Sequence, residues 1–294
     1  MTIIKQTLSM TALSLSMSMS MSMSMSVFAT ANAQQAWMSP EVGTAWSQGY
    51  LGQGVRINMI DDFGSTCERA FARCHGAWTT WQAQSVAPRA SVVTHEAVTG
   101  VVGLVASTLN VFNLSYSFYS SLTSFPTELA LLGYAQSGRA VIVKAAGNSS
   151  IPVGAAVPSG EYRGRVDNLA VSLAGQPSAI LVGALAKNGT PANPASMASY
   201  SNVAGTSPVV QRNFLVVGVD SNAMGGLAGT SFAAPIVSGY AAIVGSKFTS
   251  ASATAVANQL LNTARTDTVT GYHAAIYGRG EASLTRALAP VSIR

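Results

Sequence analysis

Short runs of almost wholly apolar residues recur along the chain and alternate with segments of helical character. Runs without polar alternation are typical of strands that are buried on both faces of a sheet. The runs expected to form strands are residues 55–60, 110–115, 140–145, 179–184 and 214–219. Helices are expected over residues 128–137, 231–248 and 251–263. Strands that alternate with helices predict an α/β fold, here a three-layer α/β/α arrangement with a mostly parallel central sheet.

Charged side chains are scarce in this chain. Only 9% of the 294 residues are Asp, Glu, Lys or Arg, against roughly 25% in ordinary soluble domains. The formal net charge is +5 and the basic residues form no run, so nucleic acid is not expected as a partner. Hydrophobic residues make up 48%, enough for a sizeable core. The body of the chain lacks an uninterrupted apolar stretch of about 18 residues, and we expect no stable membrane association.

Residues 1–33 have the pattern of a secretory signal peptide. They carry one basic residue, Lys5, then a Leu-, Met- and Ser-rich stretch with a Met-Ser repeat, and they close on Ala-Asn-Ala at Ala33. The alternative is a disordered tail that is not removed. The signal peptide predicts a secreted or periplasmic protein in which residues 34–294 form one domain.

The two cysteines, Cys67 and Cys74, lie close together in the sequence. An exported chain enters an oxidising compartment, which favours a disulfide between them. Two neighbouring cysteines could also supply half of a zinc site, but the chain has no second pair. We therefore expect the disulfide and no metal.

The string GTSFAAP, residues 229–235, stands at the start of the long apolar helix. A helix start presents backbone N–H groups without intrahelical partners and the positive end of the helix dipole. The hydroxyl of Ser231 is therefore expected beside donors that could bind an oxyanion. The simpler interpretation is a Thr-Ser helix cap, which is common. The full seven-residue string is more specific than a cap.

This string resembles the nucleophile motif of subtilisin-like serine proteases, the subtilase or S8 peptidase family. The resemblance extends through residues 54–61, 113–117, 145–148, 198–202 and 277–280, and the order Asp, His, Ser is that of the subtilisin triad. It implies a subtilisin-like fold and a serine endopeptidase that hydrolyses a polypeptide substrate through an acyl-enzyme. The segment after the expected catalytic histidine is shorter than is usual in the family, so the chain resembles a small variant. We expect a monomer.

The resemblance also assigns roles to individual residues. Asp61, His95 and Ser231 correspond to the catalytic triad, and Asn148 corresponds to the side-chain donor of the oxyanion hole. A serine is a poor nucleophile until an imidazole takes its proton, and the aspartate orients that imidazole. The residues expected to bind substrate are Ser115, Tyr116, Ser117, Ala145, Ala146 and Gly147.

Two histidines compete for the role of general base. His75 is followed by glycine, as the family histidine usually is, whereas His95 is followed by Glu96. We nevertheless expect His95, because His75 follows Asp61 too closely for the strand and loops that normally intervene.

Two further observations favour His95. The base should open a helix, and a helical apolar stripe follows His95. The stripe consists of Val98, Val101, Val102 and Val105. In addition, a disulfide at Cys74 would hold the adjacent His75 away from Ser231.

The chain departs from the family pattern in two ways that bear on cofactors and on the core. One strand–helix unit is missing from the expected element order after His95, and in the family this region carries a calcium loop. We therefore expect no calcium and no other cofactor, and activity that survives a chelator. Lys144 lies in an apolar strand, where a buried ammonium needs a partner that the sequence does not identify.

Other functions fit the sequence less well. A catalytically inactive relative that binds peptides in the same cleft would explain the irregular segment around His95. An esterase of similar architecture is a further alternative. Sedolisins have a Glu/Asp pair in place of the histidine and an aspartate where Asn148 stands, and an α/β-hydrolase requires G-x-S-x-G, which the chain lacks.

Mass spectrometry of the unreduced, exported protein tests the disulfide. We expect Cys67 and Cys74 to be joined, and the small ring to stabilise the fold by about 2 kcal/mol through loop entropy. Two free thiols in that sample would contradict the pairing.

Overall fold

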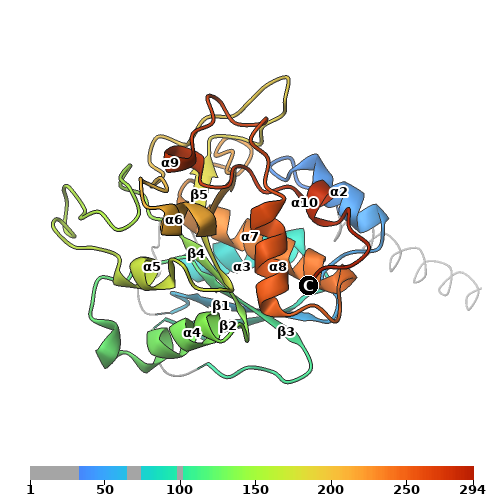
Figure 1. Ribbon diagram of the computed structural model, residues 1–294, viewed down its shortest axis with the longest axis horizontal. Coiled ribbons are helices and arrows are strands. Elements are labelled where there is room, and N and C mark those ends of the chain that lie inside the picture. Colours follow the sequence, from blue (N-terminus) through green and yellow to red (C-terminus); the bar gives the residue numbers. More distant parts are fainter. Residues whose placement is uncertain (1–32, 65–73, 98–101) are drawn as a thin grey trace, which may run out of the picture. The chain divides into compact units, whose positions relative to one another are not determined.

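In the part of the chain that the structure, a computed structural model, describes, six parallel strands form one central sheet (Figure 1). The strands are β1 (Val55–Asp61), β2 (Ser91–Glu96), β3 (Leu109–Leu114), β4 (Val141–Ala145), β5 (Ala179–Leu185) and β6 (Phe214–Gly218). Their order in the sheet is β2-β1-β3-β4-β5-β6, and each neighbouring pair is parallel. The predicted α/β fold with a parallel central sheet is confirmed.

The structure describes residues 33–64, 74–97 and 102–294. Residues 36–294 form one compact unit. All but the last residue of the predicted signal peptide lies outside the described residues. The signal peptide and the domain boundary at residue 33 therefore stay predictions.

Helices cover both faces of the sheet, because neighbouring residues of a strand point to opposite sides. The helices on one face are α3 (His75–Val86), α7 (Thr230–Lys247) and α8 (Ala253–Asn262). Those on the other face are α4 (Pro126–Gln136), α5 (Asn168–Leu173) and α6 (Pro208–Asn213). Met59 of β1 belongs to the hydrophobic cluster on the first face, and its neighbour Ile60 belongs to the cluster on the second.

Helix α7 is the most deeply placed element of the structure. All of its residues except Ser231 and Lys247 are buried. It contacts β1, β3, β4, β5 and β6 on one side and α3 and α8 on others. A helix that is hydrophobic all round must be buried in this way, and the predicted long apolar helix is confirmed.

The other helices of the described ranges are short and lie around this core. They are α2 (Pro40–Ser47), η2 (Leu122–Ser124), α9 (Ala274–Tyr277) and α10 (Leu284–Ala287). Figure 1 shows α2, near the start of the described chain, beside α10 near its end. Glu41 of α2 joins them, since its carboxylate accepts hydrogen bonds from Ser283 Oγ at 3.0 Å and from the Thr285 N–H at 3.1 Å.

The prediction of a helix that begins near His95 is wrong. His95 lies inside strand β2, residues 98–101 lie outside the described residues, and residues 102–105 are not helical. The helix lies earlier, as α3, where its buried positions Gly76, Thr79, Ala83 and Val86 follow the three- and four-residue spacing of a helix. Glycine and threonine occupy half of these positions, so a search for hydrophobic periodicity does not find them.

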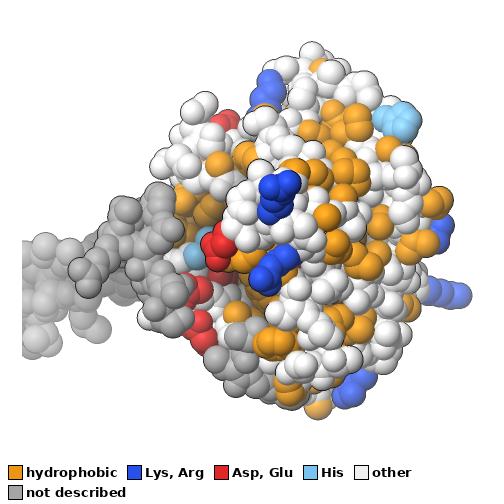
Figure 2. All heavy atoms as spheres, turned by 90° about the vertical axis from the view of Figure 1, so that its left-hand side faces the viewer, with side chains coloured by type: hydrophobic (Ala, Val, Ile, Leu, Met, Phe, Trp, Pro, Cys, Tyr) orange, Lys and Arg blue, Asp and Glu red, His pale blue; other side chains and the backbone are white. Residues whose placement is uncertain are grey.

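Charged side chains are also sparse on the surface. Figure 2 shows few basic and acidic side chains on one face, among many hydrophobic and uncharged polar groups. Within the described part of the chain, we find no helix whose length and hydropathy would let it cross a bilayer.

The close packing of α7 against α3 can be tested at Gly239. A Cβ atom added there would stand 2.5 Å from Val86 Cγ1, so we expect Gly239→Ala to lower the free energy of unfolding by about 1–3 kcal/mol through overpacking. In α4, a Cβ at Gly133 would meet no atom within 4 Å. Gly133→Ala should therefore raise the free energy of unfolding by about 0.5–1 kcal/mol. Urea denaturation measures both, and equal effects would contradict the packing.

Candidate active site

Polar side chains gather at the carboxyl ends of three neighbouring strands. Asp61 is the last residue of β1, Ser115 follows β3, and Asn148 lies in the turn after β4. From β1 the chain continues to β2 on one side, while β3 lies on the other side of β1. Open α/β sheets usually bind ligands where the strand order changes direction in this way.

The carboxylate of Asp61 is buried and held by hydrogen bonds from three groups. Its Oδ1 accepts from the Asp62 N–H at 2.8 Å and lies 2.6 Å from His75 Nδ1. Its Oδ2 accepts from Thr79 Oγ1 at 2.9 Å. Because a buried charge is costly without partners, these contacts fix the carboxylate in one orientation.

His75 is the first residue of α3, and 39% of its side chain is exposed. A carboxylate can only accept, so the His75 Nδ1 that faces Asp61 carries a proton and the neutral ring keeps its lone pair on Nε2. The ring also packs against Phe232, with 5.8 Å between the ring centroids. This contact brings the imidazole next to the start of α7, where Ser231 precedes Phe232.

Close contacts explain the glycine after His75. The Gly76 N–H donates to the Asp62 carbonyl at 2.9 Å. A Cβ atom at Gly76 would stand 2.6 Å from the Phe63 ring and 2.7 Å from the Asp62 carbonyl oxygen. A larger residue would therefore push α3 away from the end of β1, and with it His75 away from Asp61.

The structure does not bring His95 to Asp61, and the expectation that His95 acts as the base is corrected here. In the parallel register His95 pairs with Ile60, and its Nε2 lies 3.3 Å from Asn58 Oδ1. Side chains alternate along a strand, so His95 shares the face of Ile60, opposite to the face of Asp61 and α7. Burial and then the nearby Arg56 lower the pKa of His95.

Glu96 binds a backbone N–H group of the turn after β1. It lies on the face opposite to His95, and its Oε2 accepts from the Phe63 N–H at 2.9 Å. This bond ties the turn after β1 to the end of β2. The irregular His95-Glu96 pair is therefore part of the edge of the sheet.

Ser231 and Ser115 hold each other through two reciprocal hydrogen bonds. Ser231 Oγ donates to the Ser115 carbonyl at 3.1 Å, and Ser115 Oγ donates to the Ser231 carbonyl at 2.9 Å. The Ser231 carbonyl would normally accept from the residue four positions on, but this is Pro235, which has no N–H. Ser115 Oγ instead donates to this carbonyl, so the helix tolerates proline at the last position of the GTSFAAP string.

A chain of buried polar groups supports Ser115 from below. Asn113 Nδ2 donates to Ser115 Oγ at 2.9 Å. Ser238, about two helical turns after Ser231 in α7, donates from its Oγ to Asn113 Oδ1 at 3.1 Å. All three side chains are buried. Buried networks of this kind define one geometry when every member has a partner.

The side chain of Asn148 is oriented by Thr230, which begins α7. Asn148 Oδ1 accepts from the Thr230 N–H at 2.8 Å and from Thr230 Oγ1 at 2.9 Å, while the Gly147 N–H donates to Thr230 Oγ1 at 3.0 Å. These donors identify the oxygen of the amide, so Asn148 Nδ2 points the other way, toward Gly229, the residue before α7. The Asn148 N–H₂ group therefore lies close to the N-terminal end of α7, where backbone N–H groups have no acceptor within the helix.

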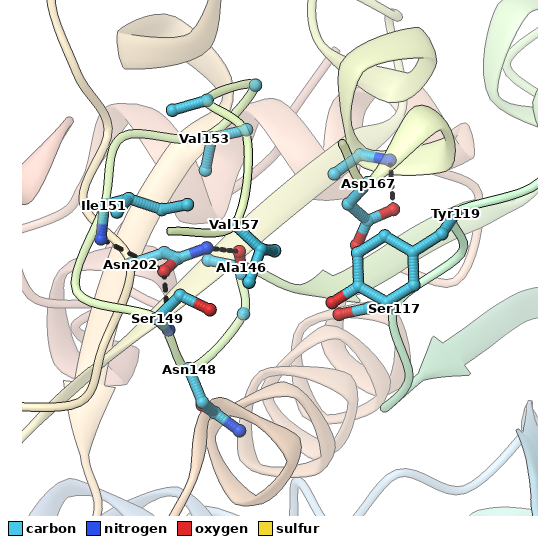
Figure 3. Close-up of a pocket in the computed structure, with 14 residues that line it drawn as sticks. Ser117, Tyr119, Ala146, Asn148, Ser149, Ile151, Val153, Val157, Asp167 and Asn202 are labelled. Atoms are coloured by element: carbon cyan, nitrogen blue, oxygen red, sulfur yellow. Dashed lines mark hydrogen bonds between the residues drawn. The ribbon is translucent and has the colours of Figure 1, made fainter. Parts of the chain in front are cut away.

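Asn202 shapes the turn that carries Asn148. Its Nδ2 donates to the Ala146 carbonyl at 2.8 Å, and its Oδ1 accepts from the N–H groups of Ser149 at 2.9 Å and Ile151 at 3.3 Å (Figure 3). Gly147 has a φ of +106°, and a Cβ there would stand 2.5 Å from Asn202 Nδ2. Only glycine fits this turn without strain.

A second polar pair lies behind the segment after β3. Tyr116 OH donates to Glu128 Oε1 at 3.1 Å, and the residue Glu128, in the first turn of α4, is fully buried. Burial raises the pKa of Glu128. Burial, followed by the Glu128 carboxyl, raises the pKa of the Tyr116 hydroxyl well above its usual value. Tyr116 thus anchors the segment to the body of the protein.

The sequence-predicted residues divide into three groups. Asp61, Asn148 and Ser231 lie at the same edge of the sheet, together with the turns that hold Ser115–Ser117 and 145–147. His95 does not join them. Cys74 directly precedes α3, whereas Cys67 lies outside the described residues, so their disulfide stays a prediction.

Sequence reasoning missed several residues of the site, namely His75, Thr79, Thr230, Asn202 and Phe232. The His-Gly pair at His75 was the available signal, and the spacing argument overrode it. As for metals, the described ranges contain no group of three or more His, Cys, Asp or Glu side chains that could hold an ion.

A comparison with protein families matches residues 76–280 to the subtilase family, peptidase S8. No curated protein matches the chain. Among solved structures, the prenylagaramide maturation protease PagA is similar with a TM-score of 0.57 and 17% identity, over 85% of this chain and 98% of that one.

Two further structures are similar to this chain. The MycP3 protease of the type VII (ESX-3) secretion system has a TM-score of 0.54 and 21% identity, over 87% of this chain and 89% of that one. The PatG macrocyclase, solved in complex with peptide, has a TM-score of 0.55 and 15% identity, over 85% of this chain and 95% of that one. At these identities the likeness shows the fold, which is subtilisin-like as predicted.

Proposed function

The chain belongs to the subtilase family and is a serine-type peptidase, and on this premise we propose that it is a secreted endopeptidase with Asp61, His75 and Ser231 as its catalytic triad. The contact of 2.6 Å between Asp61 Oδ1 and His75 Nδ1 carries the proposal. It is supported by the packing of the His75 ring on Phe232, beside Ser231. Export is proposed from the pattern of residues 1–33, and the Cys67–Cys74 disulfide from the compartment that export implies.

In the first half-reaction, His75 Nε2 takes the proton from Ser231 Oγ as the oxygen attacks the carbonyl carbon of the scissile peptide bond. The carbonyl π electrons move onto its oxygen, and Asp61 stabilises the imidazolium that forms. When the tetrahedral intermediate collapses, the C–N bond breaks and His75 gives its proton to the leaving amine. The acyl group remains on Ser231 as an ester.

In the second half-reaction, water takes the place of the amine. His75 removes a proton from the water as its oxygen attacks the ester carbonyl, and then returns that proton to Ser231 as the ester bond breaks. Free acid and free serine result. The same base serves both halves, which requires an imidazole that is neutral at rest.

The oxyanion of both intermediates needs donors that are already in place. The proposed donors are Asn148 Nδ2 and the Ser231 N–H, which lies in the first turn of α7 and so has no acceptor within the helix. Thr230 fixes the amide before substrate arrives, so no reorganisation is needed during the reaction.

The triad is tested by comparing the two histidines. We expect His75→Ala and Ser231→Ala each to lower kcat/KM for a peptide substrate by roughly 10⁴- to 10⁶-fold, because triad members act as a unit. His95→Ala should keep most of the activity. Circular dichroism checks that each variant is folded, and an inactive His95→Ala beside an active His75→Ala would reverse the assignment.

A fluorophosphonate probe separates the enzyme from an inactive relative that binds peptides. The active enzyme is labelled at Ser231 and the labelling depends on His75. An unlabelled wild-type protein would contradict the proposed function.

The oxyanion hole is tested at Asn148. We expect Asn148→Ala to lower kcat by roughly 10²- to 10³-fold with little change in KM, because the lost hydrogen bond forms mainly in the transition state. Asn258→Ala, the same substitution at an exposed position of α8, is the matched control and should leave kcat unchanged. An Asn148→Ala variant with full kcat would remove Asn148 from the mechanism.

A further inference from the structure

A small cavity lies beside Asn148, and its lining contains one charged side chain. Fourteen residues line the cavity, which has a volume of about 20 Å³. They come from the segment after β3, the turn after β4, the loop that follows this turn, the start of α5 and, with Asn202, the segment between β5 and α6. Asp167 is the charged one, and Figure 3 shows its carboxylate near Tyr119, away from Asn148.

The charge of Asp167 is already compensated from behind. Its Oδ2 lies 2.7 Å from Lys144 Nζ, and its Oδ1 accepts from the N–H groups of Phe118 at 3.2 Å and Ala170 at 3.1 Å. Lys144 is fully buried in β4, where its Nζ also donates to the Ala145 carbonyl at 2.8 Å. The sequence predicts that the buried Lys144 needs a partner but does not identify it. The structure shows that the partner is Asp167, which lines this cavity.

The pair changes what the cavity can bind. An unpaired carboxylate in such a wall would attract a basic side chain, but here a fixed ammonium lies directly behind it. A lysine or arginine that entered the cavity would gain little from a carboxylate with three donors and would meet the repulsion of Lys144 Nζ. The carboxylate of a substrate Asp or Glu side chain would be repelled by the Asp167 carboxylate. The cavity therefore disfavours both signs of charge.

The size of the cavity sets a second limit. A buried water needs about 10–15 Å³ of such space, so a volume of about 20 Å³ admits a side chain of only one or two heavy atoms. Val153 and Val157 supply apolar wall on one side. Tyr119 supplies another wall and is held by stacking on Tyr162, with 4.7 Å between the ring centroids.

We propose that this cavity makes the enzyme select small uncharged side chains, such as those of alanine and serine, at the substrate residue whose carbonyl Ser231 attacks. The inference rests on the proposed function, because it takes Asn148 as a donor to that carbonyl. The side chain of a residue begins one bond from the carbon next to its carbonyl, so it lies close to the oxyanion donor Asn148, which lines this cavity. Lys144 acts as a specificity-determining residue through Asp167.

A peptide series that differs only at the attacked residue tests the proposal on the wild-type protein. We expect kcat/KM for alanine to exceed the values for phenylalanine, lysine and glutamate by at least about tenfold each. A value for lysine or phenylalanine equal to that for alanine would overturn the proposal. A wild-type protein that neither cleaves the series nor reacts with a fluorophosphonate overturns the proposed function as well, whereas a labelled enzyme with the wrong preference overturns this inference alone.

Two variants of the ion pair isolate the role of Lys144. Lys144→Met leaves the charge of Asp167 facing the cavity and should raise the ratio of kcat/KM for lysine over alanine by at least about tenfold. The double variant Lys144→Met/Asp167→Asn removes that charge and should return the ratio to within about threefold of wild type. A ratio that does not rise in the single variant, or that stays high in the double variant, would overturn the role of Lys144.

A third variant tests size and does not depend on the buried pair. Tyr119→Ala removes a half-exposed wall and should raise the ratio for phenylalanine over alanine by at least about tenfold. Labelling of Ser231 counts the active sites in every variant, so that rates are compared per folded enzyme. An unchanged ratio in Tyr119→Ala would overturn the size limit.

Discussion

The burial of α7 against the sheet is the constraint on which the rest of the structure depends. The helix contacts five of the six strands, and all of its residues but Ser231 and Lys247 are buried. A helix held on all sides cannot shift along its axis, so its first turn has one position relative to the strand ends. Thr230 then orients Asn148, and Ser231 exchanges hydrogen bonds with Ser115. The precision of the site is a consequence of packing far from it.

The chain has few charged side chains, and two buried ones, Asp61 and Lys144, have defined partners. Asp61 is held by His75 and Thr79, and Lys144 lies against Asp167. A buried charge without a partner would cost several kcal/mol, so each group has a defined contact. The two pairs lie at the same end of the sheet, one beside Ser231 and one behind the cavity at Asn148. Electrostatics therefore enters both the proposed chemistry and the proposed selection of substrate.

Much of the fold could be predicted because buried strands and a buried helix must be apolar along their whole length. Five of the six strands and helix α7 follow from that rule, with ends that differ by only a few residues. Helices α4 and α8, which bury only part of their surface, were also predicted within a few residues. The rule does not find β2, whose residues are partly exposed at the edge of the sheet, nor α3, whose buried face is small and polar. The positions of Asp61, Asn148 and Ser231 at one edge of the sheet could be predicted because the short strings that resemble the family's motifs stand at the ends of apolar elements.

The sequence by itself determined the α/β class and the family, and it supplied three of the proposed site residues, because these depend on local composition and on short strings. Only the tertiary structure decided which histidine meets Asp61. The alternation of side chains in β2 turns His95 to the face of Ile60, and the close packing of Gly76 under Phe63 brings His75 to Asp61. Only the tertiary structure, likewise, paired Lys144 with Asp167, since a side-chain contact between separate elements leaves no pattern in the chain.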